Sequence, residues 1–287
     1  MTDMNFDDYQ SRLFGIAYGM LGTVMDAEDV LQDAWVRYQK LEAPIQHPYA
    51  YLRKIVTNLS LDRLKSAKVQ REQYIGEWLP EPVLTSDDNP AKLLQRSESI
   101  SMALLVVLEN LSPLERAVFI LREVFDYEYA EIARTLERSE SACRKLFSRA
   151  KEHVQRARPR FDVPQELHDR LVSQFFEATR HGNMQEMVNF LAEDTVLYSD
   201  GGGVVSAATR PLYGRDTIIA FFSGLYAKTH RDGVNFTFEQ SQLNGQTGLL
   251  MRDSTGEIIL VATFEASLTH ITVIRLILNP AKLSGLV

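Results

Sequence analysis

Basic side chains and tyrosines are interleaved along residues 49–71. Arginine and lysine can neutralise phosphates, and each such contact adds salt-dependent affinity without sequence information. Tyrosine rings can stack on bases that have left a duplex. The stretch therefore predicts contact with an opened nucleic-acid strand, although packing between helices explains the tyrosines equally well. These residues are Tyr49, Tyr51, Arg53, Lys54, Arg63, Lys65, Lys68 and Arg71.

A second basic segment covers residues 138–160, where eight basic residues stand against two acidic ones. The pattern predicts a short helix over 129–136, a turn at 137–139 and a longer helix over 140–156, which together form a helix-turn-helix. Arginine paired with guanine is the commonest base contact, but which arginines read bases and which hold phosphates stays open. The polar side of the second helix carries Arg138, Ser141, Arg144, Lys145, Ser148 and Arg149.

Acidic residues gather on a helix expected to begin at Asp26, whose carboxylate would cap the free backbone N–H groups. Val30, Leu31 and Ala34 form its apolar seam at helical spacing. The polar residues outside this seam suit a basic partner, and a solvated acidic face is the alternative interpretation. They are Glu28, Asp29, Gln32 and Asp33.

The net charge of −7 over 287 residues at first argues against a nucleic-acid partner, but it is unevenly distributed. Residues 51–75 carry +4 and 138–160 carry +6, whereas 161–287 carry −5. The single cysteine, Cys143, excludes an internal disulfide framework and a cysteine-rich zinc site, and we expect it to be buried. The sequence shows no apolar run of the ~18 residues that a membrane span needs. We expect a cytoplasmic protein with no cofactor, no metal and no membrane contact.

The elements that position these residues fall into three groups. Helical periodicity covers residues 6–68 and returns at 100–156, where Ser112-Pro113-Leu114-Glu115 is a strong helix start. Residues 76–92 lack periodicity and contain Pro80, Pro82 and Pro90, so they predict a linker. After residue 161 amphipathic helices precede alternating strands, the first expected at Val234–Phe238 with its phenylalanines buried. This order predicts an α+β domain.

The motifs resemble those of a known family. Residues 26–35 resemble the polymerase-binding helix of bacterial extracytoplasmic-function (ECF) RNA polymerase sigma factors, and 51–64 resemble the helix that contacts the promoter −10 element. Residues 111–116 and 129–133 resemble the −35-reading domain. The resemblance implies a multidomain chain with two all-α sigma modules, a region 2 helical bundle and a region 4 helix-turn-helix.

The rest of the chain resembles the sigma-J-like subgroup, which carries a fused C-terminal SnoaL-like domain, a cone-shaped α+β fold. One departure is Val204, because the subgroup has lysine after its three glycines. A loop of ordinary function, and a Trp78 packed locally at the end of the first domain, are the alternatives to a docking role. The matching motifs are Trp78-Leu79-Pro80-Glu81-Pro82, Asp200-Gly201-Gly202-Gly203 and Asn279-Pro280-Ala281-Lys282-Leu283.

The resemblance implies region 2 over residues 1–75, a linker over 76–99, region 4 over 100–160 and a SnoaL-like regulatory domain over 161–287. Expected partners are core RNA polymerase, through its β′ clamp helices and β flap, and promoter DNA at −35 and −10. The loop between Pro44 and Pro48 would receive a flipped −10 base, with Asn58 and Asp62 nearby. The cone is expected to dock within the chain and regulate it in cis, and the free chain is expected to be a monomer without enzymatic activity.

Two other functions remain open at this point. SnoaL-like cones include isomerases and cyclases that use a carboxylate or histidine as a base, so the last domain is alternatively a small-molecule enzyme or sensor fused to a DNA-binding module. A plain helix-turn-helix repressor is the weaker alternative, because it leaves the first 75 residues without a role. The candidate bases and their neighbours are His168, His181, Asp194, Tyr198, Asp200, Tyr213, His230 and His270.

Overall fold

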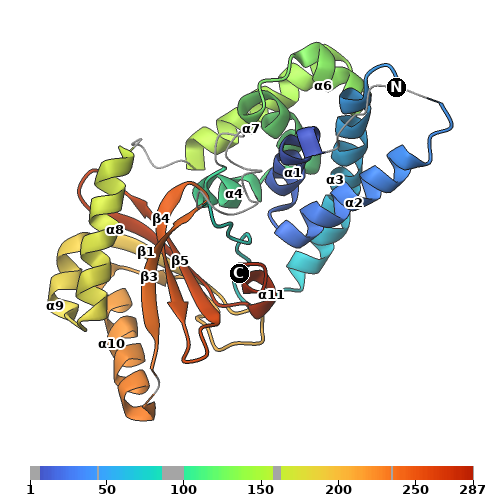
Figure 1. The fold of residues 1–287 in the computed structure, drawn as a ribbon. Coiled ribbons are helices and arrows are strands. Elements are labelled where there is room, and N and C mark those ends of the chain that lie inside the picture. The colour runs from blue at the N-terminus through green and yellow to red at the C-terminus, as the bar shows by residue number, and fades with distance from the viewer. Residues whose placement is uncertain (1–6, 44, 86–99, 158–162, 234, 287) are drawn as a thin grey trace. The chain divides into compact units, whose positions relative to one another are not determined.

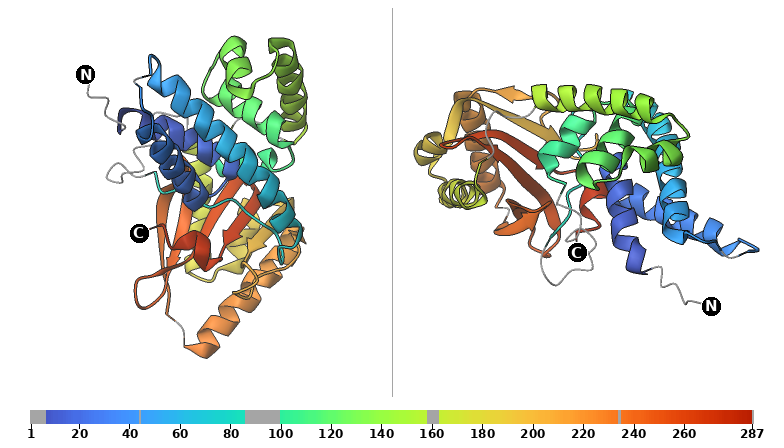
Figure 2. Two further views of the ribbon diagram at one scale, coloured as in Figure 1. Left: turned by 90° about the vertical axis from the view of Figure 1, so that its right-hand side faces the viewer. Right: turned by 90° about the horizontal axis from the view of Figure 1, so that it is seen from above.

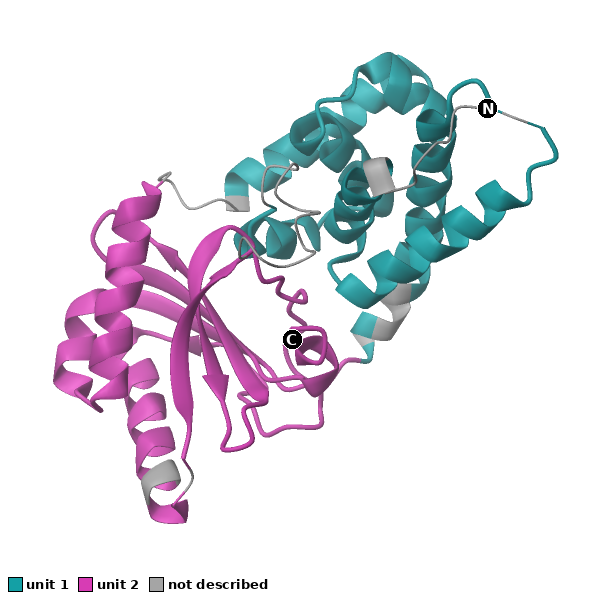
Figure 3. Ribbon diagram, viewed as in Figure 1, with its two compact units in different colours: residues 1–73, 87–158 teal, residues 74–86, 159–287 magenta. Residues whose placement is uncertain are grey.

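The computed structural model describes residues 7–43, 45–85, 100–157, 163–233 and 235–286 (Figure 1). The chain divides into two compact units, coloured separately in Figure 3. The first unit comprises residues 1–73 and 87–158, and the second comprises 74–86 and 159–287. The chain therefore passes from the first unit into the second at residue 74 and returns at residue 87.

The first unit begins with three helices, α1 (Asp7–Leu21), α2 (Val24–Gln39) and α3 (Pro48–Glu72). Apolar residues at helical spacing in each are buried between them, as the periodicity predicts. The predicted helix start at Asp26 is wrong, because α2 begins at Val24 with Thr23 as the N-cap residue. Thr23 has extended backbone angles and donates its hydroxyl to Asp26 Oδ2 at 2.5 Å. Asp26 lies instead in the first turn, where the helix dipole favours its charge.

The second group of helices in this unit comprises α4 (Met102–Leu108), α5 (Pro113–Phe119), α6 (Tyr129–Leu136) and α7 (Glu140–Ala157). The predicted start at Ser112 is confirmed, since Ser112 and Glu115 form a capping box with Pro113 in the first turn. A π-helical turn, η2 (Ile120–Val124), continues α5. The predicted helix-turn-helix is confirmed as α6 and α7, and Glu137 ends α6 in the left-handed region at φ 53°.

A buried charge cluster joins the two groups of helices. Glu109, at the end of α4, forms ion pairs with Arg71 of α3 and Arg116 of α5. Arg116 also donates from Nε to the Gly19 carbonyl at 3.0 Å, and Arg71 donates to the Leu21 carbonyl at 2.8 Å. Burial lowers the pKa of Arg116 to about 9 and that of Arg71 to about 10. Glu109 therefore supplies the counter-charge that two desolvated guanidinium groups need.

The second unit is a six-stranded sheet covered on one face by helices (Figures 1 and 2). The strand order is β2-β1-β6-β5-β4-β3, with β1 parallel to β6 and the other pairs antiparallel. Phenylalanines of the covering helices pack against this face, including Phe175 and Phe222. In chain order the elements are α8 (Gln165–Arg180), α9 (Met184–Met187), η3 (Val188–Phe190), β1 (Leu191–Asp200), β2 (Leu212–Tyr213), α10 (Arg215–Asp232), β3 (Thr237–Leu243), β4 (Gln246–Arg252), β5 (Ile258–Ala266), β6 (Ile271–Ile277) and α11 (Pro280–Leu283).

The strand prediction holds for the last three strands and fails at two places. Strand β3 begins at Thr237, while Val234 lies outside the described residues. Phe238 was expected to be buried but is partly exposed, because β3 is an edge strand of the sheet. The second failure is that strands β1 and β2 were not predicted at all.

The segment before residue 86 extends the edge of this sheet. Leu84 forms a bridge with Leu243 at the end of β3. The Val83 amide donates to Asn244 Oδ1 at 3.0 Å, and the Val83 carbonyl accepts from the Asn244 amide at 2.9 Å. Residues 83–85 are thus held by the hairpin between β3 and β4 and pack as part of the second unit. In the described part of the chain, no helix has the length and apolar character needed to cross a membrane.

We predict that Glu109→Gln lowers the free energy of unfolding of the first unit by about 3 kcal/mol, because it leaves two buried cations without a counter-charge. Amide hydrogen exchange along α1, whose carbonyls the two arginines bind, measures this loss. Glu152→Gln is the control, since Glu152 is exposed and pairs with Arg156 one turn away. Equal protection of α1 in both variants would contradict the prediction.

Candidate functional site

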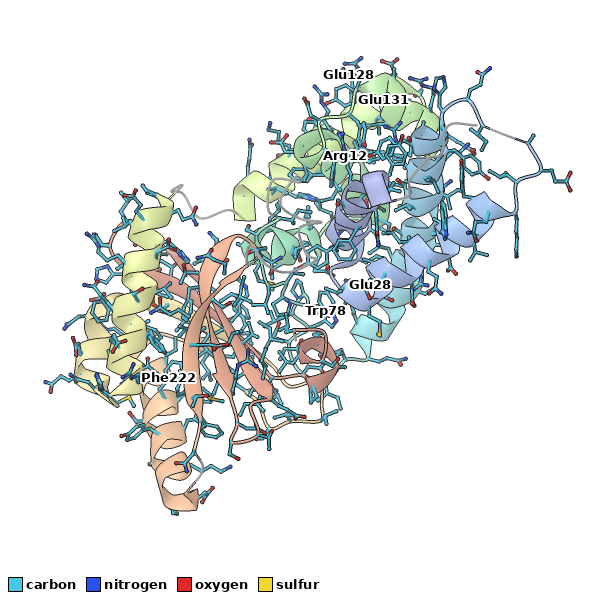
Figure 4. The ribbon with its side chains drawn as sticks, in the orientation of Figure 1. Arg12, Glu28, Trp78, Glu128, Glu131 and Phe222 are labelled. Carbon is cyan, nitrogen blue, oxygen red and sulfur yellow. The ribbon has the colours of Figure 1, made fainter. Side chains whose placement is uncertain are left out.

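Arg53, predicted to contact phosphate, is buried within the first unit. Only 5% of it is exposed, and its guanidinium carbon lies 4.1 Å from the centroid of the Tyr127 ring. Its Nη1 donates to Glu131 Oε1 of α6 at 3.1 Å. Arg12 of α1, labelled in Figure 4, also has its guanidinium carbon 4.9 Å from the centroid of the Tyr127 ring. Arg53 of α3 is therefore enclosed by residues at the start of the helix-turn-helix.

Two neighbours of Arg53 on α3 contact the same region. The Tyr49 hydroxyl forms a short hydrogen bond with the Tyr127 hydroxyl, and burial together with this contact raises the pKa of Tyr49. Lys54 Nζ lies 2.8 Å from Glu137 Oε1, at the turn between α6 and α7. Three of the predicted −10 residues thus contact residues 127–137, with Arg53 buried and Lys54 still partly exposed to solvent.

The other predicted residues of α3 have different surroundings. Tyr51 is half-buried with its ring centroid 6.5 Å from that of Tyr38, which agrees with helix packing. Asn58 and Asp62 are exposed, and Lys65 pairs with Asp62 at 2.9 Å. The side chain of Lys68 lies outside the described residues, and Arg71 belongs to the buried charge cluster.

A groove of about 570 Å³ separates the start of α3 from α6. Cationic, anionic and aromatic side chains line it, and the described part of the loop before Pro48 contributes to its wall. The loop expected to receive a flipped base therefore faces α6 in this arrangement; Pro44 itself lies outside the described residues. Lining residues include Tyr9, Gln46, His47, Arg53, Glu131 and Arg134.

The acidic residues of α2 are organised by one arginine of α3. Arg63 donates to Asp26 at 3.2 Å, to Asp29 at 3.1 Å and to Asp33 at 3.5 Å. Glu28, drawn on α2 in Figure 4, is exposed, as is Gln32. Arg63 was predicted to contact DNA, yet here its guanidinium holds the carboxylates of the neighbouring helix.

The predicted recognition helix α7 presents its polar side to solvent. All six predicted residues are exposed. Arg144 lies 4.5 Å from the Tyr129 ring centroid and pairs with Glu140 at 2.9 Å. Cys143 is fully buried, as expected, and burial raises the pKa of its thiol. The exposed set is Arg138, Ser141, Arg144, Lys145, Ser148 and Arg149.

In the second unit, Asp200 at the end of β1 binds the segment that precedes residue 86. Its carboxylate is 1% exposed. It accepts hydrogen bonds from the Tyr74 hydroxyl at 2.6 Å, the Leu79 amide at 2.9 Å and the Gly202 amide at 3.0 Å. Lys282 Nζ completes the set at 2.6 Å. Burial and the Asp200 carboxylate raise the pKa of Tyr74.

The C-terminal motif closes over the same segment. Lys282 Nζ donates to the Leu79 carbonyl at 2.5 Å and lies 4.3 Å from the centroid of the Trp78 ring. Asn279 Nδ2 donates to the Tyr74 hydroxyl at 2.8 Å. Trp78 is half-buried, while Pro80, Glu81 and Pro82 are buried. The three motifs that resemble the sigma-J-like subgroup thus meet at one place in the second unit.

The glycines after Asp200 allow this close packing. Gly202 has φ +66° and Gly203 has φ +73°, conformations that favour glycine, and a Cβ on Gly202 would lie 2.5 Å from Asn279 Cγ. Val204, which stands where the subgroup has lysine, is exposed. The cation beside Asp200 is Lys282 of the C-terminal motif.

The candidate bases of the cone have separate neighbours in the described part of the second unit. His168 lies 3.2 Å from the Phe264 carbonyl, His181 lies 3.6 Å from Glu177, and His270 lies 2.8 Å from Thr269. Asp200 binds the linker segment. Asp194 and Tyr213 are exposed. Tyr198 is half-buried, and its burial together with the nearby Tyr213 raises its pKa. The His230 side chain lies outside the described residues. Apolar side chains form a buried cluster between helices and sheet, and the same unit also buries polar residues such as His168, Thr263 and Arg275.

The residues that complete these contacts were missed by sequence reasoning. Tyr127, Glu131 and Glu137 cover α3, and Tyr74 binds Asp200. Helical spacing could have placed Glu131 on the polar side of α6. No local pattern shows that a residue pairs with another one 78 positions away in the chain.

Helices and motifs of this kind define a transcription factor that works with RNA polymerase, and the comparisons with known proteins agree. Residues 6–69 match Sigma-70 region 2, and residues 101–154 match Sigma-70 region 4. The chain is 33% identical to ECF RNA polymerase sigma factor SigJ of Mycobacterium tuberculosis over 299 aligned residues, covering 99% of this chain and 94% of SigJ. It is 32% identical to the probable ECF RNA polymerase sigma factor SigI of the same species over 188 residues, or 64% of each chain.

The crystal structure of M. tuberculosis SigJ matches this structure with a TM-score of 0.78 and 30% identity, over 98% of this chain and 97% of that one. The chain therefore belongs to the ECF RNA polymerase sigma factor family. The predicted fold class is confirmed, with helical region 2 and region 4 followed by an α+β domain of SnoaL-like type.

We predict that Asp200→Asn speeds amide hydrogen exchange at Leu79 at least tenfold, because the new amide nitrogen cannot accept from the donors that surround it. Mass spectrometry of the peptide covering residues 74–85 measures the change. Asp194→Asn is the matched control, since Asp194 is exposed on the same strand. Unchanged exchange at Leu79 in Asp200→Asn would show that the carboxylate does not hold this segment.

Proposed function

We propose that this sigma factor keeps three of its −10 residues, Tyr49, Arg53 and Lys54, in contact with region 4 until core RNA polymerase binds. The burial of Arg53 between Tyr127 and Glu131 carries the proposal. A guanidinium that is 5% exposed cannot reach a phosphate, so α3 has to separate from α6 before Arg53 contacts DNA. Tyr49 and Lys54 contact the same segment, residues 127–137. We therefore expect the contacts of all three residues to break together when α3 separates from α6.

Core polymerase is the partner that favours the open arrangement in this proposal. The acidic face of α2, with Glu28, Asp29, Gln32 and Asp33, binds the β′ clamp helices, and region 4 binds the β flap. The exposed side of α7 then reads the −35 element while α3 contacts the −10 element. The free chain is a monomer, located in the cytoplasm with its promoters. Support comes from family membership and from the exposure of both polar faces.

The C-terminal unit regulates these steps in cis by holding the middle of the connection between the two sigma regions. The chain passes through the second unit at residues 74–86 before it returns to the first. Asp200 and Lys282 fix this passage, so the tether between the regions is shorter than its residue count suggests. Tethering sets the effective concentration of one region for the other. Membership of the ECF sigma factor family supports a non-enzymatic transcription factor.

Run-off transcription with purified core polymerase tests the proposed function. The chain together with core polymerase is expected to give a promoter-dependent transcript, and neither component alone is expected to do so. Asp33→Asn and Arg144→Gln separate the two interfaces, the first weakening core binding and the second weakening promoter choice at −35. Absence of any transcript on a cognate promoter set would contradict the function.

We predict that Glu131→Gln raises the affinity of the free chain for promoter DNA by about threefold to tenfold. The substitution removes the anion paired with Arg53, while glutamine still accepts from the Glu128 amide and keeps the capping box. Glu128→Gln is the control, because Glu128 begins the same helix but pairs with Arg122. Filter binding at fixed salt measures both, and equal affinities would contradict covering of α3.

We predict that a chain ending at residue 160 differs from the intact chain in run-off transcription at matched concentration. The acidic C-terminal unit and its hold on residues 74–86 are both lost, so the shortened chain is also expected to bind free promoter DNA more tightly at equal salt. The intact Asp200→Asn chain provides a second comparison in which the domain is retained. Equal transcription and equal DNA binding in all three would exclude regulation in cis.

A further inference from the structure

The groove between α3 and α6 carries more positive than negative charge. Arg53, Lys54 and Arg134 line it, and among the described residues of its lining Glu131, labelled in Figure 4, is the single carboxylate. Glu131 balances Arg53, and Glu137 at the end of α6 balances Lys54. The charge of Arg134 is therefore left in excess, and the groove favours an anionic occupant.

Arg134 is placed to hold such an anion. Its side chain is exposed on α6, and its Nε donates to the Ala130 carbonyl one turn earlier at 3.2 Å. Among the residues that the structure describes, none is paired with its two Nη atoms. The hydrogen bond from Nε limits the rotamers of the guanidinium, and the remaining N–H groups form the fork that binds a phosphate or carboxylate through two oxygens.

A second donor of the lining lacks an acceptor. Arg53 is buried and donates from Nη1 to Glu131, but its Nε, which is also buried, has no hydrogen-bond partner among the described residues. A buried N–H group without an acceptor costs free energy, and such groups are uncommon in native structures. An occupant with acceptor oxygens would supply what this guanidinium lacks.

Two tyrosine rings line the same groove. Tyr9 of α1 and Tyr49 of α3 have ring centroids 5.0 Å apart, and both side chains are half-buried. Nucleobases stack on aromatic side chains of this kind. Gln46, exposed on the loop before α3, adds an amide that both donates and accepts hydrogen bonds. The lining therefore suits a flat ring with polar edges as well as an anion.

We propose that this groove binds a nucleoside monophosphate, with the base against Tyr9 and Tyr49 and the phosphate on Arg134. Its volume of about 570 Å³ lies within the range of small-molecule sites, roughly 300–1,000 Å³. A small aromatic carboxylate shares the flat ring and the negative charge. The volume and the amide of Gln46 favour the nucleotide, because a base has hydrogen-bonding edges that a plain aromatic ring lacks.

The site is complete only while α3 and α6 face each other, because Tyr49 belongs to the first helix and Arg134 to the second. A ligand that binds one of two arrangements shifts the equilibrium toward that arrangement by its difference in affinity. The nucleotide is therefore expected to stabilise the covered state and to lower the affinity for core polymerase. This consequence rests on the proposed function, whereas the site rests on its lining residues.

Isothermal titration calorimetry of the intact chain with adenosine 5′-monophosphate tests the site. One nucleotide is expected to bind per chain. Inorganic phosphate, adenosine and benzoate are each expected to bind at least about tenfold more weakly, because each lacks one of the groups that the lining recognises. Tighter binding of benzoate than of the nucleotide, or equal binding of phosphate and nucleotide, would overturn the assignment.

Two substitutions separate the parts of the ligand. Arg134→Gln is expected to weaken the nucleotide about tenfold and to leave adenosine unchanged, and Tyr9→Leu is expected to weaken both. Arg156→Gln is the matched control, because Arg156 is an exposed arginine of α7 that pairs with Glu152 and lies outside the groove. Arg134 is exposed, so its variant is expected to unfold at the wild-type temperature. Wild-type nucleotide affinity in Arg134→Gln would overturn the site.

The affinity for purified core polymerase, measured with and without the nucleotide, separates the site from the proposed function. The nucleotide is expected to lower this affinity for the wild-type chain and to have a smaller effect on Arg134→Gln, a comparison that corrects for nucleotide bound to the polymerase itself. Nucleotide binding that depends on Arg134 but leaves the polymerase affinity unchanged would keep the site and contradict the covering of α3.

Discussion

The enclosure of Arg53 is the interaction on which the arrangement of the sigma regions depends. The Arg53 guanidinium has lost its hydration and is stabilised instead by the face of the Tyr127 ring and by the Glu131 carboxylate. Its burial is favourable only while both partners stay in place. The buried triad of Arg71, Glu109 and Arg116 makes the same demand at the other end of the interface. Within the first unit, region 2 and region 4 are therefore joined by two sets of buried charged contacts.

The second unit applies a different constraint, on the chain that joins these regions. Asp200 receives four donors and Lys282 closes the site from the C-terminal motif, so residues 74–85 behave as part of the sheet domain. The cation of this site is Lys282 of α11, which lies within the C-terminal motif and pairs with Asp200 at 2.6 Å. Val204, after the glycines, is exposed.

Sequence patterns predicted correctly those elements that depend on interactions between neighbouring residues. The capping box at Ser112 and the helix-turn-helix follow from neighbouring residues, and both are found. Asp26 was misplaced because Thr23 already has the backbone conformation of an N-cap. Phe238 was misjudged because an alternating pattern does not tell an edge strand from a central one. Arg63 and Arg53 share a basic pattern, and only the tertiary fold shows that one binds acidic residues of α2 while the other is covered by α6.

The distance between α3 and α6, measured in the free chain and in the polymerase-bound chain, tests most directly whether region 4 covers α3. Spin labels at Ala50 and Arg134, which both line the groove, report this distance by pulsed electron paramagnetic resonance. Buried Cys143 is first replaced by alanine so that it is not labelled. If region 4 covers α3, the distance distribution is short and narrow in the free chain and long in the complex with core polymerase. A broad distribution in the free chain, or a short one that persists in a complex active in transcription, would contradict it.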